Sequence, residues 1–193
     1  RYLWWSGSEH VMIIEERTID TDVENGASLT IVGRSLESIL DRRIVWKQTI
    51  IEGNFQDSIE KLLNEAIISP EDEKRKIPNF IFKKSEDPRI TAMELEAQIS
   101  EGENLYDAIV ALCEGMDIGF KITLSDQNEL IFTLYKGEDR SYAQETNPYV
   151  IFSPDFDNVL NSNYYESETE TKNVVLVCGH KADDAKEYVT IGE

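Results

Sequence analysis

Residue types that often carry catalysis or bind metals are few in this sequence, and their spacing matches no known reactive pattern. The two histidines, His10 and His180, stand far apart, and neither belongs to an HExxH or HxH pattern of metal ligands. Ser35 follows Gly33 and Arg34 without the second glycine of a GxSxG nucleophile turn, so a helix cap explains it better. Glycine-rich phosphate loops are also missing. We therefore predict no catalytic, cofactor-binding or metal-binding residue and no cofactor.

Carboxylates are so abundant that counting them cannot exclude an acid pair of the glycosidase kind. Asp155 with Asp157, or glutamates between Glu94 and Glu103, would suit such chemistry on paper. A solvated acidic face explains each of these residues more simply, since Asp and Glu are mostly exposed in folded proteins. We interpret the chain as a protein without enzymatic activity.

The alternating acids from Asp20 to Glu24 resemble the first half of a calcium loop. Such a loop needs glycine at its sixth position and glutamate at its twelfth, where Asn25 and Ile31 stand instead. A hairpin turn is the better interpretation of this segment.

The net charge excludes some classes of partner. The 193 residues include 38 Asp and Glu against 19 Lys and Arg, a formal net charge of −19. Such a surface repels nucleic-acid phosphates and anionic lipid heads, so we predict no specific nucleic-acid binding and no membrane association. The longest apolar runs are also far shorter than the about 20 residues that a membrane helix needs. Cys113 and Cys178, which form no CxxC pair, are predicted to be buried small hydrophobic residues.

Strand patterns dominate the first part of the chain. The runs His10–Asp20 and Ser28–Val32, separated by turn-forming residues, predict a hairpin. The next segment, Ser35–Leu40, has the apolar spacing of one or two helical turns, with Ser35 as its cap.

Two longer helices are predicted in the middle of the chain. One follows the cap Asn54 and carries an apolar stripe from Phe55 to Ala66, and the other carries a stripe from Leu105 to Met116. Their entries share a strand, a Glu-Gly turn, an asparagine cap and an aspartate in the first turn. This similarity indicates either a duplicated unit or convergence of two helix starts on the same capping chemistry.

Further strands are expected at several places, and they complete the predicted organisation. These strands are 80–82, 118–124, 129–135, 149–152, 159–166, 173–178 and 187–191. The expected fold class is α+β, with β-barrel-like strands at both ends and an inserted α+β unit that contains the two helices. The barrel-like domain would comprise residues 1–47 and 137–193, and the insertion residues 48–136.

One long string points to a family. The residues Leu29–Trp46, LTIVGRSLESILDRRIVW, resemble a signature of siphophage tail proteins of the ReqiPepy type, often found in prophages. Similarity continues through later strings, so that it covers nearly the whole chain. These strings are Arg75–Asn79, Gly119–Ile122, Tyr135–Ser141 and Phe152–Asn158.

The resemblance implies a structural role in the virion, at the tail tip, like the hub proteins that join the tail tube to the baseplate or fibre. It implies other phage tail proteins as partners and a homo-oligomer, a trimer in the full-length protein. The implied location is the virion tail, assembled in the bacterial host cytoplasm. Because the chain begins at Arg1 without a signal-peptide pattern, we interpret both ends as cuts through a longer protein.

Within the signature, Arg34, Asp41, Arg42, Arg43 and Trp46 are the candidate subunit-contact residues. The alternative is that these charges form caps and salt bridges around the short helix of the same chain. Two other functions stay open: a tail-associated cell-wall hydrolase, and a receptor or carbohydrate-binding module.

Overall fold

The computed structural model describes residues 1–8, 10–24, 26–169, 174–180 and 186–192. The chain divides into two compact units, Arg1–Glu138 and Asp139–Glu193. The predicted α+β class is confirmed, because helices and mainly antiparallel sheets occur together in the first unit.

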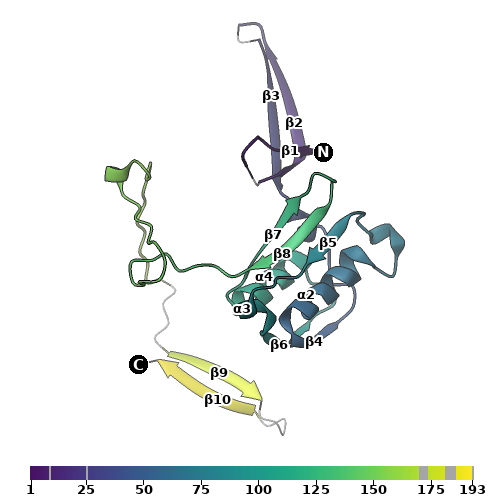
Figure 1. Ribbon diagram of the computed structural model, residues 1–193, viewed down its shortest axis with the longest axis vertical. Helices are drawn as coiled ribbons and strands as arrows, with labels where there is room; N and C mark the ends of the chain where they lie inside the picture. Colours follow the sequence, from purple (N-terminus) through teal and green to yellow (C-terminus); the bar gives the residue numbers. More distant parts are fainter. Residues whose placement is uncertain (9, 25, 170–173, 181–185, 193) are drawn as a thin grey trace. The chain divides into compact units, whose positions relative to one another are not determined.

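The first unit contains three sheets and four α-helices among its described residues (Figure 1). The sheet orders are β1-β2-β3, β4-β6 and β5-β8-β7. The strands are β1 (Tyr2–Leu3), β2 (Met12–Asp22), β3 (Gly26–Ser35), β4 (Thr49–Asn54), β5 (Phe80–Lys83), β6 (Glu94–Ile99), β7 (Gly119–Leu124) and β8 (Leu130–Tyr135). The helices are α1 (Ser38–Asp41), α2 (Phe55–Leu63), α3 (Pro88–Thr91) and α4 (Leu105–Gly115), with a π-helical turn at Asn64–Ile68 and a 3₁₀ turn at Glu73–Arg75.

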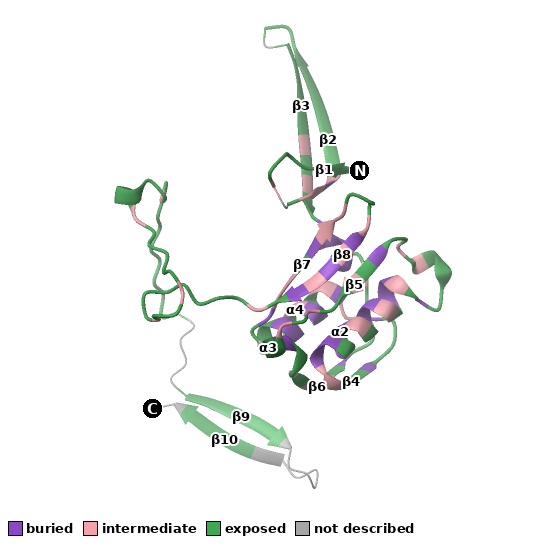
Figure 2. Cartoon of the chain, in the orientation of Figure 1, coloured by how far each residue is buried: buried purple, intermediate pink, exposed green. Residues whose placement is uncertain are grey.

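One hydrophobic core joins the two long helices to the strands, as the buried residues in Figure 2 show. Phe55 and Ile59 of α2, Ile109 of α4 and Phe132 of β8 are all completely buried. The apolar stripes predicted for both helices are therefore confirmed as the faces that pack into this core. The predicted strand at Phe80 and the hairpin of β7 and β8 are also confirmed.

Asn54 and Asn104 cap α2 and α4. Each side-chain Oδ1 accepts hydrogen bonds from the main-chain N–H groups two and three residues later, at 3.0 and 3.4 Å for Asn54 and 2.8 and 3.3 Å for Asn104. These bonds satisfy donors that have no partner within the helix. The caps predicted from the sequence are therefore confirmed.

The same two side chains also connect two segments of the first unit, one that holds α1, β4 and α2 and one that holds α3, β6 and α4. Asn54 Nδ2 donates to the main-chain oxygen of Thr91, the last residue of α3, at 2.8 Å. Asn104 Nδ2 donates to the main-chain oxygen of Asp41, the last residue of α1, at 3.0 Å. Capping alone does not require these matching cross-contacts, so they favour the duplicated unit over convergence.

The expectation that Ser35 caps the short helix is wrong. The N-cap position of α1 is Glu37, whose side chain forms no capping hydrogen bond. Ser35 is the last residue of β3, and its main-chain oxygen accepts a hydrogen bond from the Ser38 hydroxyl at 2.7 Å. Burial of Leu36 and Leu40 places this turn in the core, and packing rather than a cap defines where α1 begins.

The predicted N-terminal hairpin is confirmed as β2 and β3, which pair from Met12–Ser35 at the base to Asp22–Gly26 at the tip. The register shifts between Ile14 and Glu16, where a β-bulge leaves Glu15 unpaired. From this bulge to Val32, every described residue except Ile31 is exposed (Figure 2). The outer part of the hairpin is therefore a two-stranded ribbon that no other described part of its unit covers.

The second unit contains a 3₁₀ turn, Pro154–Phe156, and the antiparallel strands β9 (Val174–His180) and β10 (Lys186–Gly192). The strands expected at 149–152 and 159–166 are wrong, since no strand occurs there. Side chains instead bind the main chain: Asn158 accepts from the Ser153 N–H and donates to the Ile151 oxygen, both at 2.8 Å. Such local bonds compete with a sheet ladder.

The two expected terminal strands are confirmed as β9 and β10, which pair with each other. The described strands form four separate sheets, with β1–β3 and β9–β10 in different ones, and no closed barrel occurs among them. The domain ranges 1–47, 137–193 and 48–136 stay predictions.

The two cysteines differ in their surroundings. Cys113 is buried as predicted, and burial raises the pKa of its thiol to about 12. The same prediction is wrong for Cys178, which is exposed because no described residue of its unit forms a layer over the ribbon of β9 and β10.

We expect Asn54→Ala and Asn104→Ala each to lower the free energy of unfolding by about 1–3 kcal/mol, because each loses a helix cap and a bond to a carbonyl. Urea unfolding followed by circular dichroism measures this change. Gln127→Ala, an exposed turn position whose side chain makes no hydrogen bond among the described residues, is the control and should stay within about 0.5 kcal/mol. A loss confined to one asparagine would contradict their equivalence.

Candidate functional site

An ion-pair cluster lies at the base of the β2–β3 hairpin, where the bulge places the Glu15 side chain. Arg34 Nε lies 3.0 Å from Glu15 Oε2, and Arg34 Nη1 lies 2.6 Å from Asp41 Oδ2. Arg42 also pairs with Glu15. The structure therefore brings together three of the predicted contact residues, Arg34, Asp41 and Arg42, and adds Glu15.

The hairpin base is held closely enough that only glycine fits at position 33. A Cβ atom added to Gly33 would lie 1.9 Å from the main-chain oxygen of Ile13 on β2. Because the two strands approach so closely here, the backbone of the neighbouring Arg34 is held in place. From this position its side chain contacts both carboxylate partners, Glu15 and Asp41.

The cluster is joined to the core through Asn104 and Arg43. Asn104 Nδ2 donates to Asp41 Oδ1 at 3.1 Å, in addition to the Asp41 main-chain oxygen. The main-chain oxygen of Arg43 accepts from the N–H of Leu105, the first residue of α4, at 3.0 Å. Arg43 Nε is buried and has no hydrogen-bond partner within the described part of the chain. Arg43 therefore lies beside the cluster but takes no part in its ion pairs.

The cluster holds two carboxylates in their ionised forms. Hydrogen bonds from Arg34, and then from Arg42, lower the pKa of Glu15 below its usual value. The Arg34 hydrogen bond likewise lowers the pKa of Asp41, with a smaller contribution from Asn104. The same bonds raise the pKa of Arg34. All of these side chains are partly exposed, so solvent weakens each pair.

Trp46 lies in a different environment from the cluster. The guanidinium of Arg75 stacks over its ring, 4.6 Å from the ring centre, and half of the Trp46 surface is exposed. Lys47 and Glu71 form an ion pair at 2.7 Å. Both residues line a small cleft together with Trp46 and Arg75. The five predicted contact residues are thus divided: three form the cluster, Arg43 lies beside it, and Trp46 belongs to a separate exposed patch.

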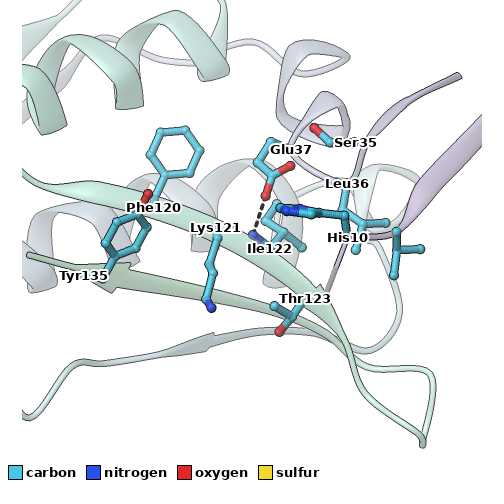
Figure 3. Close-up of a pocket in the computed structure, with 10 residues that line it drawn as sticks. His10, Ser35, Leu36, Glu37, Phe120, Lys121, Ile122, Thr123 and Tyr135 are labelled. Carbon is cyan, nitrogen blue, oxygen red and sulfur yellow. Dashed lines mark hydrogen bonds between the residues drawn. The ribbon is translucent and has the colours of Figure 1, made fainter. Parts of the chain in front are cut away.

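A cleft of about 700 Å³ lies between the hairpin base and β7 (Figure 3). His10 and Leu36 line one wall, and Phe120 and Tyr135 line the part formed by the sheet. The Glu37 carboxylate lies within this cleft and accepts a hydrogen bond from the Ile122 N–H at 2.7 Å. Glu37 is therefore engaged with the main chain of the sheet.

This contact occupies a strand edge. β7 is the last strand of the sheet β5-β8-β7, so its outer N–H and C=O groups face away from β8. A charged side chain at such an edge discourages the addition of a foreign strand. Glu37 therefore binds an N–H group at the outer edge of β7.

Across the described ranges, no group of three or more His, Cys, Asp and Glu is arranged to hold a metal ion. In the part of the chain that the structure describes, none of the helices has the length and apolarity needed to cross a bilayer.

Comparison with known proteins identifies the class of this chain as a siphovirus protein. The family model described as Siphovirus ReqiPepy6 Gp37-like protein matches residues 5–192, so the chain belongs to that family. The membership confirms the siphophage part of the sequence resemblance and suggests a structural protein of the phage that interacts with other phage proteins. No curated protein and no solved structure matches the chain.

Sequence reasoning missed two members of the cluster, Glu15 and Asn104. Glu15 stands beside Glu16 in a strand pattern, and only the bulge distinguishes the two in space. Asn104 was identified as a helix cap, but its second contact with Asp41 joins residues far apart in sequence. Neither role has a local signal.

The lowered pKa values set the direction of a pH effect. A carboxylate with a lowered pKa stabilises the folded chain above its unfolded pKa, and this contribution is lost as pH falls through the folded value. We therefore expect Glu15→Gln to be less stable than the wild type at pH 7, with the difference closing below about pH 4. Thermal unfolding at a series of pH values measures it.

Glu16→Gln is the matched control, because Glu16 is the next residue, is exposed and forms no ion pair among the described residues. Its stability difference from the wild type should stay small at every pH. If Glu15→Gln and Glu16→Gln follow the same pH profile, the cluster does not hold the hairpin base.

Proposed function

We propose that this chain is a structural component of the phage tail tip, similar to a hub or baseplate protein, and that it works by assembly with other proteins and not as an enzyme. The observation that carries the proposal is the match of the siphovirus family over residues 5–192. In the proposed setting its partners are other tail proteins, and the full-length protein is a trimer assembled in the host cytoplasm and carried in the virion tail.

The exposed apolar surface supports an assembly role. Ile19 and Leu29 on the hairpin are 73% and 59% exposed. In the second unit, Phe152 and Leu160 are 74% and 96% exposed. Large apolar side chains gathered on exposed segments are typical of surfaces that bind other proteins.

The acidic surface is consistent with this setting. A net charge of −19 disfavours adhesion to the phage genome, because like charges suppress contact with phosphates. A tail component of this charge would therefore meet passing DNA without retaining it.

Immunogold electron microscopy of intact virions tests the location. Antibodies against the chain should label the end of the tail that is distal to the capsid, and antibody absorbed beforehand with the purified chain is the control. Gold on the capsid, or no gold on purified virions, would show that the proposed location is wrong.

Cell-wall zymography tests the hydrolase alternative, and a glycan array tests the receptor-binding alternative. The chain should produce no clearing on host cell wall, because its carboxylates are explained by ion pairs and a solvated face. Clearing by the wild type would replace assembly with hydrolysis as the leading function, and specific glycan binding would favour the receptor module.

A further inference from the structure

Two parts of the first unit repeat each other along the chain. α1 and α3, α2 and α4, and β5 and β8 each begin 50 residues apart. The main-chain N–H of Phe55 donates to the Met93 oxygen at 3.0 Å, and the N–H of Leu105 donates to the Arg43 oxygen at the same distance. Each repeat therefore holds the other through the same contact. We call the segment from α1 to β5 the first repeat and the segment from α3 to β8 the second repeat.

The repeats show which positions the fold requires to be apolar. Ile59 of α2 and its counterpart Ile109 of α4 are completely buried, and so are Leu40 of α1 and its counterpart Ile90 of α3. Counterpart positions have similar main-chain surroundings. A side chain whose chemical type occurs in only one repeat is therefore not required by the shared fold.

The isoleucine at the entry to the first repeat's strand differs from its counterpart. Ile44 pairs with Asn104, just as Glu94 pairs with Asn54. Because the two asparagines are counterparts, Ile44 and Glu94 are counterparts as well.

Trp46 differs from its counterpart in the same way. It corresponds to Glu96, since each lies two residues beyond the previous pair. Ile44 and Trp46 are 44% and 51% exposed, and both glutamates are exposed too. The fold thus accepts carboxylates at both places, so folding alone does not explain an exposed isoleucine and tryptophan there.

A third exposed apolar residue extends this surface onto β4. Ile50 is 65% exposed and lies between the buried residues Thr49 and Ile51, so it faces outward from the sheet β4-β6. An extended chain rises about 3.3 Å per residue, so the three exposed side chains start within about 20 Å of one another. We call Ile44, Trp46 and Ile50 the apolar strip.

Carboxylates border the apolar strip. Glu52 of β4 lies directly opposite Glu96 of β6, and Glu94 is two residues away on the same strand. All three are exposed, and none forms an ion pair within the described part of the chain. Like charges directly opposite each other destabilise a strand pair. Cations supplied by a partner would remove this cost.

We propose that the outer face of the sheet β4-β6 binds a basic segment of another protein. The segment presents apolar side chains to the apolar strip and Lys or Arg side chains to the three glutamates. This inference rests on the proposed assembly role and names a contact surface for it. An apolar centre with a polar rim is the usual anatomy of a protein interface, and tryptophan is enriched at its energetic centre.

The apolar strip is partly ordered before a partner arrives. Arg75 stacks on the Trp46 ring, with its guanidinium 4.6 Å from the ring centre. A side chain that is already held loses less freedom on binding, which favours association.

Charge disfavours a second copy as the occupant of this face. The chain carries a net charge of −19, and two copies that met through this face would bring the same three glutamates together. A basic segment gains electrostatic attraction at the same place. The charge of the face therefore selects the partner.

Isothermal titration of the full chain with short peptides tests the partner chemistry. A peptide of alternating Lys and Leu should bind with a Kd between roughly 10 µM and 1 mM. A Glu-Leu peptide should bind at least about tenfold more weakly, because its carboxylates meet the three glutamates. A Lys-Ser peptide should bind at least about fivefold more weakly, because it leaves the apolar strip uncovered.

Variants of the chain test the location. Ile50→Ser should weaken binding of the Lys-Leu peptide at least about fivefold, and so should Trp46→Glu, which introduces the counterpart residue. Leu29→Ser removes an exposed leucine from the hairpin and should change binding less than about twofold. Glu96→Gln should weaken binding about threefold, and Glu16→Gln is its control with the same change in charge. Circular dichroism confirms that each variant folds.

Several results would overturn the proposal. One is a Lys-Leu peptide that does not bind below about 1 mM, or that binds no better than the Glu-Leu peptide. Another is an equal effect of Ile50→Ser and Leu29→Ser. Self-association of the chain that Ile50→Ser abolishes would show that a second copy covers the strip. The expected peptide binding without gold at the tail tip would contradict the proposed function alone.

Discussion

Two asparagine side chains connect the segment with α1, β4 and α2 to the segment with α3, β6 and α4. The rest of the first unit is arranged around these connections. Asn54 and Asn104 each accept hydrogen bonds from their own helix and donate one to a carbonyl of the other segment. A carboxamide can do both at separate atoms, because its oxygen accepts while its nitrogen donates, whereas a serine or threonine hydroxyl has one oxygen for both roles. An aspartate would keep the cap but lose the donor, which is why asparagine suits both positions.

The Asn104 contact also connects the hairpin to the rest of the unit. Asn104 binds both the main chain and the carboxylate of Asp41, and Asp41 binds Arg34 at the hairpin base. Arg34 in turn binds Glu15, which the bulge exposes to it. Exposed ion pairs contribute little energy each, so the close strand contact at Gly33 and the bulge supply the geometry. The charges then connect the hairpin base to α1 through Arg34 and Asp41.

The parts of the fold that sequence predicted well are those with local causes. The α2 and α4 stripes and their asparagine caps are visible within one or two turns, and the alternation of β2 and β3 is visible within each strand. The Ser35 cap failed because packing of Leu36 and Leu40 decides where α1 begins.

The expected strands at 149–152 and 159–166 failed for a related reason, since strand-like residues form strands only where a partner edge exists. The candidate site was predicted in part. Arg34, Asp41 and Arg42 stood close together in the signature, but Glu15 joined them only through the bulge. Trp46 does not belong to the ion-pair cluster, because its ring packs against Arg75, which comes after the next helix in the sequence.

Each of the two units contains a two-stranded ribbon with an exposed apolar face. In β9 and β10, Val175 lies opposite Ile191 and Val177 opposite Val189, so that four branched aliphatic side chains share one face. These side chains are about half exposed. Among the described residues, neither ribbon has a layer over its apolar face, so the assembly proposed above would cover both faces and meet the cost of ordering each ribbon. A net charge of −19 opposes such an assembly between copies of this chain in free solution, and the high local concentration of the proposed virion setting would offset it.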